Sequence, residues 1–343
     1  MPIVQIDNPG QIGIITDIRP QNLPNNAFTS GGNIRFTKQA AKKFEGHSQV
    51  FGSPSVIPYW LMPVQTPSVA YWIYAGLTKV YVTDGSTHFN LTRQSGGVDN
   101  DYSATEDLNW SGGVIGGIPV LNNGVDDPQM WNPLSTGQRL ASLTYDASNT
   151  WEDMNYKAAV IRPFRDYLVA LDVTKVGDRN ARLVKWSTSA IIGSIPNTWD
   201  DLDDTEDAGE YELAQTGGDC IDCLPLRDVN IIYKDDSVWG MMFIGGPDIF
   251  RFYQLFGDVG ILTRRCVKEF DGKHFVVTTG DVIVHDGAQK ESVITDRRRE
   301  ELFNTIDSNS FSRVYVAPNY AKQEMWICYP VSGNTLPNKA MVW

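Results

Sequence analysis

Short runs of apolar, aromatic and β-branched residues, four to seven residues long, recur along the chain between Gly, Asn, Asp and Pro. This pattern is typical of strands joined by tight turns rather than of helices. The clearest stretch predicts strands over 69–74 and 79–82, followed by a type I′ hairpin turn at Asp84-Gly85. The chain is therefore expected to be all-β.

The unit of apolar strand, polar turn and second apolar strand repeats at a regular interval. Turn centres at Asp84 and Asn123 lie 39 residues apart, and those at Asp236, Gly280 and Asn319 are separated by 44 and 39 residues. Periods of about 40–50 residues are typical of the antiparallel blades of a β-propeller. A β-sandwich remains the alternative, because no invariant dipeptide marks each repeat.

Two segments depart from the repeat. Residues 1–53 hold few apolar runs, and they are predicted to form an extended N-terminal arm used in assembly. Residues 54–343 are predicted to form the propeller-type body, with a loop-rich insertion around 90–155 and a last blade left incomplete at Trp343. Lysines gather on the arm at 38–43.

A single short helix is predicted over 295–307. Thr295 or Asp296 caps its start, and Leu302 and Ile306 stand at i, i+4 spacing on one face. The three arginines at 297–299 are expected on its solvated side.

Charge excludes several classes of protein. The 343 residues carry a net charge of −12, which argues against the basic footprint of a nucleic-acid-binding protein and against an anionic membrane surface. The charge-free stretch 46–78 is interrupted by prolines every four or five residues, so no membrane-spanning helix is expected. No basic residue precedes Arg19, and no signal peptide is expected.

The strongest electrostatic feature is an acidic loop with seven carboxylates over residues 200–210. A solvated loop is favoured over a calcium site, because the order of ligands in an EF-hand is absent. Cys220 and Cys223 lack a second cysteine pair at zinc spacing. No histidine, serine or glycine-rich motif indicates catalysis or nucleotide binding, so neither an enzyme activity nor a cofactor is expected.

Two stretches of the chain resemble the tail nozzle, or tail tubular protein B, group and related tail-hub proteins of short-tailed bacteriophages. The resemblance covers roughly residues 10–50 and 160–343. In the first stretch it is carried by Gly13, Asp17, Pro20, Leu23, Pro24, Ala27, Phe28, Asn33, Arg35 and Phe36. In the second it is carried by Ser237, Val238, Trp239, Met241, Gly245, Pro247 and Phe250.

The resemblance implies a structural virion protein without enzyme activity. It implies a propeller-bearing subunit made in the host cytoplasm and assembled in the phage tail as a ring, usually a homohexamer. Such a ring encloses the channel for DNA ejection and contacts the tail adaptor ring and fibres, spikes or a tip plug. Double-stranded DNA would pass without specific binding.

An acidic lumen would suit such a conduit, because it repels the duplex from all sides and avoids phosphate contacts. We therefore hypothesise that part of the acidic loop faces the lumen, and an outward loop explains the same composition. The candidate residues are Asp200, Asp201, Asp203, Asp204, Glu206 and Asp207.

Arg35, Phe36, Tyr59 and Trp60 are candidate assembly contacts, and the proline-flanked segment around Tyr59 could equally be a strand leading into the first blade. The competing functions are a receptor-binding or glycan-binding tail protein and a propeller glycosidase.

Overall fold

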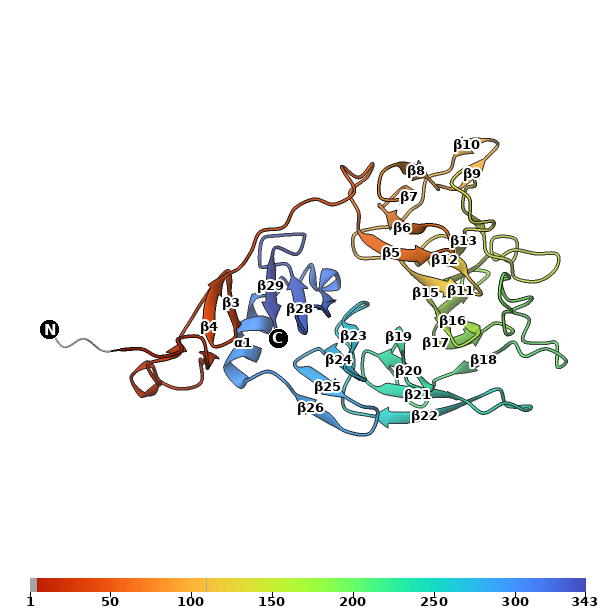
Figure 1. Ribbon diagram of the computed structural model, residues 1–343. Coiled ribbons are helices and arrows are strands. Elements are labelled where there is room, and N and C mark those ends of the chain that lie inside the picture. Colours follow the sequence, from red (N-terminus) through yellow and green to blue (C-terminus); the bar gives the residue numbers. More distant parts are fainter. Residues whose placement is uncertain (1–4, 109) are drawn as a thin grey trace.

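The computed structural model describes residues 5–108 and 110–343, which form a six-bladed β-propeller with an N-terminal arm (Figure 1). Residues 1–4 of the predicted arm lie outside the described part of the chain. The predicted all-β propeller is confirmed, and the β-sandwich alternative is wrong, because six separate sheets follow one another around a centre.

Each blade is an antiparallel sheet of consecutive strands, four in blades 1–5 and three in blade 6. Blade 1 contains β5 (Trp60–Gln65), β6 (Ala70–Ala75), β7 (Val80–Thr83) and β8 (His88–Asn90). Blade 2 contains β11 (Ser111–Ile115), β12 (Ile118–Asn122), β13 (Gln129–Met130) and β14 (Ala141–Ser142). Blade 3 contains β15 (Tyr156–Phe164), β16 (Tyr167–Lys175), β17 (Asp178–Trp186) and β18 (Gly209–Glu212).

The remaining blades follow the same plan. Blade 4 contains β19 (Cys220–Leu226), β20 (Val229–Lys234), β21 (Val238–Phe243) and β22 (Phe250–Phe256). Blade 5 contains β23 (Val267–Phe270), β24 (Lys273–Val277), β25 (Val282–His285) and β26 (Lys290–Ser292). Blade 6 contains β27 (Tyr315–Asn319), β28 (Glu324–Tyr329) and β29 (Lys339–Val342).

The first strand of each blade lies at the centre of the propeller, where β5, β11, β15, β19, β23 and β27 contact one another in sequence order. The last strands, among them β18, β22 and β26, lie at the outer edge (Figure 1). Each blade uses consecutive strands joined by short turns, so one repeat of about 40 residues in the sequence corresponds to one blade.

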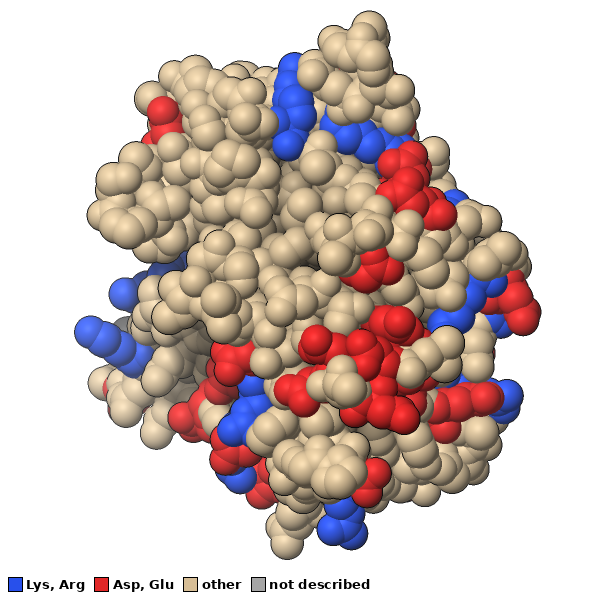
Figure 2. All heavy atoms as spheres, turned by 90° about the vertical axis from the view of Figure 1, so that its right-hand side faces the viewer, with Lys and Arg blue, Asp and Glu red and all other residues tan. Residues whose placement is uncertain are grey.

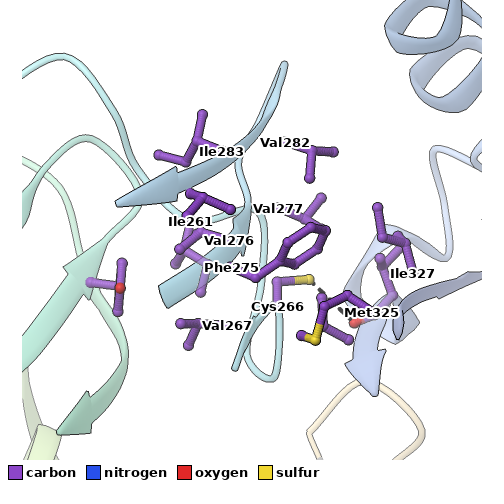
Figure 3. Packing of buried hydrophobic residues seen from close by; sticks show 14 of the residues in the cluster. Ile261, Cys266, Val267, Phe275, Val276, Val277, Val282, Ile283, Met325 and Ile327 are labelled. Carbon is purple, nitrogen blue, oxygen red and sulfur yellow. Dashed lines mark hydrogen bonds between the residues drawn. The ribbon is translucent and has the colours of Figure 1, made fainter. Parts of the chain in front are cut away.

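Apolar clusters lie between neighbouring blades. Separate clusters join blades 1 and 2, blades 2 and 3, and blades 3 and 4, and a larger one joins blades 4, 5 and 6. Figure 3 shows the last of these, where Phe275 and Cys266 of blade 5 face Met325 and Ile327 of blade 6. None of the clusters formed by described residues joins blade 6 to blade 1.

The arm is folded and attached to the last blade. It contains β1 (Gly13–Ile14), the 3-10 turn η1 (Pro20–Asn22), β2 (Ala27–Phe28), β3 (Ile34–Thr37) and β4 (Ala40–Lys43). The β3–β4 hairpin lies beside β28 and β29, and an irregular segment then crosses to β5 (Figure 1).

The helix is confirmed as α1 (Asp296–Thr305), which precedes the 3-10 turn η2 (Phe311–Arg313), and Leu302 is its buried residue. Within the described residues, no helix is long and apolar enough to cross a membrane.

Two details of the sequence prediction need correction. The segment 90–155, expected to be a loop-rich insertion, holds the β9–β10 hairpin (Gln94–Ser95, Val98–Asp99) and all of blade 2, whose outer strands are only two residues long. The predicted type I′ turn at Asp84-Gly85 is wrong, because only Gly85 has a positive φ. Asp84 instead accepts hydrogen bonds from the backbone N–H groups of Ser86 and Thr87 in a longer loop.

Candidate functional site

The acidic loop lines a groove on the surface of the described part of the chain. The connection from β17 to β18 forms one wall, and the connection from β21 to β22 forms the other. The groove has a volume of about 980 Å³ and lies at the outer edge of blades 3 and 4. Figure 2 shows the acidic side chains gathered on this side of the molecule.

The floor of the groove is aromatic. Tyr211 of β18 stacks on Phe252 of β22 with ring centroids 4.7 Å apart and planes inclined by 7°. Trp186 lies against Phe252 and Phe250 at 5.9 and 5.4 Å. Tyr211 is exposed and Phe252 is half-buried, so the floor offers a flat apolar surface to a bound molecule.

Two of the carboxylates that line the groove, Asp201 and Glu210, form ion pairs with lysines. The ammonium group of Lys185 is fully buried, and it contacts Asp201 and lies 3.3 Å from Glu210. Lys175 binds Glu210 at 2.5 Å. Burial alone would raise the pKa of Asp201, but the hydrogen bond and charge of Lys185 outweigh it and hold that pKa below its usual range.

The remaining acidic residues lie at the rim of the groove. Asp203 accepts hydrogen bonds from the hydroxyl and backbone N–H of Thr205, and these bonds lower its pKa. Asp204, Glu206 and Asp248 are exposed and form no ion pair with a described residue. The rim therefore carries uncompensated negative charge above an aromatic floor.

The two further candidate residues of the acidic loop are Asp207 and Asp200. The Asp207 carboxylate accepts a hydrogen bond from the hydroxyl of Tyr167 at 3.2 Å. Burial, followed by the charge of Asp207, raises the pKa of Tyr167 to about 12. Asp200 accepts only the backbone N–H of Leu202. The acidic residues thus lie together on the outside of the propeller and away from its centre.

The four candidate assembly residues make contacts within the chain. Arg35 forms a bidentate pair with Glu324 of blade 6, and Phe36 packs on Phe28 inside the arm. The Tyr59 hydroxyl donates to Glu106 at 3.1 Å. Trp60 begins β5 and is half-buried, so the alternative prediction of a strand leading into the first blade describes this segment.

Sequence reasoning missed Lys185, Tyr211 and Phe252, the residues that support the acidic loop and form its floor. A lysine inside the apolar strand sequence RLVKW was the available signal for Lys185, because a buried cation requires a nearby carboxylate. No local signal indicated that β18 and β22, from different blades, would form one floor.

The cysteines and histidines form no metal site within the described ranges. No group of three or more His, Cys, Asp or Glu side chains is arranged to hold a metal ion there. Burial raises the pKa of the Cys220 and Cys223 thiols to about 12, so both thiols stay protonated in the apolar cluster between blades 3 and 4.

No family model and no curated protein matches the chain. Among solved structures it is similar to the N-terminal domain of BBS1 in complex with ARL6 (11% identity, TM-score 0.46, 80% of this chain and 77% of that chain). It is also similar to the extracellular domain of the putative hybrid two-component system BT4673 of B. thetaiotaomicron (10%, 0.43, 84% and 33%). PorZ of the Porphyromonas gingivalis type-IX secretion system is a third (11%, 0.39, 86% and 48%).

The chain spans about a third of the length of the BT4673 domain. At these identities and TM-scores, the similarities carry no argument about activity or partners. What is established for the chain is its own architecture, a six-bladed β-propeller with a folded N-terminal arm.

Proposed function

We propose that the chain is a structural subunit of a short phage tail, which assembles as a homohexameric ring around the channel for DNA ejection. The main support is the arm, which contains the first of the two stretches that resemble the tail nozzle group. The arm and the segment that follows it expose a series of large apolar side chains, which are Ile6, Ile12, Ile18 and Val50 in the arm and Ile57 just after it. Exposed apolar surface of this kind is typical of assembly interfaces.

The distribution of charge supports a head-to-tail arrangement of subunits. Lys38, Lys42 and Lys43 on the β3–β4 hairpin are exposed, and they form no ion pair with a described residue. The acidic groove lies on the opposite side of the molecule (Figures 1 and 2). Contacts between two different, complementary surfaces generate a closed ring when the rotation between subunits closes.

In this proposal the protein has no catalytic role and resides in the virion. Some of the exposed carboxylates of the acidic loop face the lumen and repel passing DNA. The arm and the groove contact neighbouring subunits and the tail adaptor ring. Fibres, spikes or a tip plug attach to other surfaces.

Single-particle imaging of the purified protein and of intact virions tests the proposal. The expected result is a ring with rotational symmetry and an axial opening that admits a duplex about 20 Å wide. A protein that is monomeric at every concentration and absent from virions would refute it.

A charge-reversal experiment tests the arrangement of subunits. Lys42→Glu with Lys43→Glu should weaken self-association, and reversing Asp203 and Asp204 to Lys in the second copy should restore it. Sedimentation of the single variants and of their mixture is the measurement. Arg227→Glu, at an exposed arginine that forms no ion pair with a described residue, is the control. Rings that assemble equally well from every variant would contradict the head-to-tail arrangement.

The groove favours a second candidate, a tail protein that binds a host glycan. An aromatic floor beneath a rim of carboxylates offers a stacking surface and hydrogen-bond acceptors for sugar hydroxyls. Calorimetry with host surface glycans should then detect binding that Phe252→Ala abolishes. Ser86→Ala, on a distant exposed loop, should leave it intact. The absence of binding to any host glycan would exclude this candidate.

A further inference from the structure

Cationic side chains converge at the centre of the propeller, although the chain as a whole has a charge of −12. Arg162 lies on β15, Lys268 lies on β23, and Arg264 and Arg265 immediately precede β23. These first strands line the centre of the molecule. All four side chains are half-buried.

A single buried carboxylate, Asp222 of β19, lies among them. It receives the Arg162 Nε and Nη2 atoms at 2.6 and 2.9 Å. It also accepts the backbone N–H groups of Cys223 at 2.9 Å and Arg265 at 3.1 Å. A carboxylate has about four acceptor positions, and all four of these are occupied. Asp222 therefore cannot also serve the side chains of Arg264, Arg265 or Lys268.

Arg264 reaches across the centre without finding a partner. Its Nη1 atom lies 3.0 Å from the position that a Cβ on Gly124 would occupy, beside the carbonyl oxygen of Ala159. The side chain thus extends from blade 5 to blades 2 and 3. Nη1 is buried without a hydrogen bond, and no ion pair with a described residue involves this guanidinium. The charges of Asp222 and, to a smaller extent, Asp172 act on Arg264, but Asp222 is saturated with other donors and Asp172 is bound by Arg179 at 2.7 and 2.8 Å.

The cationic groups of Lys268 and Arg265 also lack a full set of hydrogen-bond acceptors among the described residues. Val267 points into the apolar cluster, so its neighbour Lys268 points to the other side of the strand. The Lys268 ammonium group has no hydrogen bond or ion pair with a described residue. Burial lowers its pKa, and the charges of Arg162 and Arg265 act in the same direction, while the charge of Asp222 opposes them without reversing the shift. Arg265 donates from Nη1 only to the Tyr59 carbonyl oxygen, at 3.1 Å.

We propose that the centre of the propeller binds a small multivalent oxyanion, of the size and charge of inorganic phosphate, on Arg264, Arg265 and Lys268. A buried cation without a partner is costly, and an oxyanion supplies several acceptors in the planar arrangement that guanidinium groups bind. The side chains of Arg264 and Arg265 cross the centre, so a duplex cannot enter it. The site is independent of the proposed ring, because one subunit contains all its residues.

Thermal unfolding and calorimetry with inorganic phosphate test this site. Phosphate should raise the Tm of the wild-type protein in a saturable way, compared with chloride at equal ionic strength. Arg264→Gln and Lys268→Met should each weaken phosphate binding at least tenfold. Arg227→Gln, at an exposed arginine that has no ion pair within the described part of the chain, should leave phosphate binding unchanged.

A second readout separates binding from a structural role of Arg264. In phosphate-free buffer Arg264→Gln should melt no lower than the wild type, because it removes a buried charge that has no partner. If Arg264→Gln does not fold, Lys268→Met is used in its place. The ³¹P line width of added phosphate then separates phosphate binding from a structural role. Equal responses to phosphate in all variants, or a wild-type response no larger than that to chloride, would overturn the proposal.

Discussion

One group of buried polar residues, a tyrosine and two histidines, forms a complete hydrogen-bond network. Between blades 4 and 5 the Tyr233 hydroxyl lies 2.7 Å from His274 Nδ1 and 2.6 Å from His285 Nε2. Gly287 N–H donates to His285 Nδ1, so the proton of His285 is on Nε2 and points to Tyr233. Tyr233 then donates to His274, whose Nε2–H donates to the Pro225 carbonyl oxygen. Every donor has an acceptor only while both imidazoles are neutral.

The network predicts a loss of stability in mild acid. Burial lowers the pKa of both His274 and His285 from 6.5 to about 4. The unfolded chain therefore takes up protons first as the pH falls, and stability present above pH 6.5 is lost progressively down to about pH 4. The expected loss is on the order of 2–3 kcal/mol for each histidine.

Urea unfolding at pH 7, 6, 5 and 4 measures this loss. The double variant His274→Gln with His285→Gln should show a much flatter dependence over the same interval. Carboxylates with lowered pKa values, such as Asp84 at about 2, lose their contribution only below about pH 4. A wild-type protein whose unfolding free energy is constant from pH 7 to pH 4 would contradict the assignment.

Asp222 gives a second prediction at the residue scale. Asp222→Asn removes the only carboxylate paired with Arg162 and leaves that cation buried among other cations. We expect a loss of about 3–5 kcal/mol in the free energy of unfolding. Asp219→Asn is the matched control, because its pair with Arg179 is largely exposed and should contribute less than about 1 kcal/mol. Equal effects of the two changes in denaturant unfolding would disprove the special role of Asp222.

The arm is an element with its own attachment to the body. Arg35 binds Glu324 of β28 through two hydrogen bonds of 2.6 and 3.0 Å and stacks over Phe44 at 4.6 Å. Phe44 in turn contacts Trp326 edge-on at 5.2 Å. Further contacts of the arm with the body include His47 beside Trp326, an exposed Glu45–Lys322 pair and a hydrogen bond from Arg297 to the Thr16 carbonyl oxygen. We expect the half-buried Arg35 cluster to hold the hairpin on blade 6 more strongly than these.

Loosening this attachment should free the arm without unfolding the propeller. Glu324→Gln weakens the pair with Arg35, so amide hydrogen exchange in residues 34–43 should accelerate about tenfold or more, while the amides of β16 stay protected. Glu45→Gln, at an exposed residue 3.7 Å from Lys322, should change nothing. Unchanged exchange in the hairpin of Glu324→Gln would show that other contacts hold the arm.

On the scale of the whole molecule, the closure between blades 6 and 1 differs from the other junctions. The apolar clusters formed by described residues join only the consecutive blades. Polar contacts close the circle instead. Arg313 of η2 lies 2.7 Å from Glu106 and 3.1 Å from Asp107, and Arg265 reaches the Tyr59 carbonyl oxygen. We therefore expect this junction to open more readily than the other junctions between blades.

Arg313→Gln should open this junction before the rest of the molecule unfolds. We expect a loss of about 1–3 kcal/mol in stability and faster hydrogen exchange in blade 1 than in blade 3. Arg182→Gln, in an exposed pair with Glu212, is the control and should have little effect. Uniform exchange in all blades of the Arg313 variant would argue against a weak junction.

The sequence determined the blades because their information is local. Alternating apolar residues and turn residues at a period near 40 specify one antiparallel sheet after another. The spacing of Leu302 and Ile306 predicted the helix, whose N-cap position is Thr295 although the Thr295 side chain makes no capping hydrogen bond. Blade 2 was only partly evident, because the apolar run before the turn at Asn123 marked β12 but β13 and β14 are too short to leave a pattern. The acidic loop was evident from composition, since charge density does not depend on the fold.

Only the tertiary structure decided which residues meet. Tyr211 and Phe252 form the floor of the acidic groove although 41 positions separate them in the sequence. Lys185 pairs with Asp201 of the acidic loop, which follows its own strand in the chain. Arg264 and Arg265 follow each other in the chain, yet one extends to blades 2 and 3 and the other to blade 1. These contacts depend on the closure of the propeller, which brings together strands from distant parts of the chain.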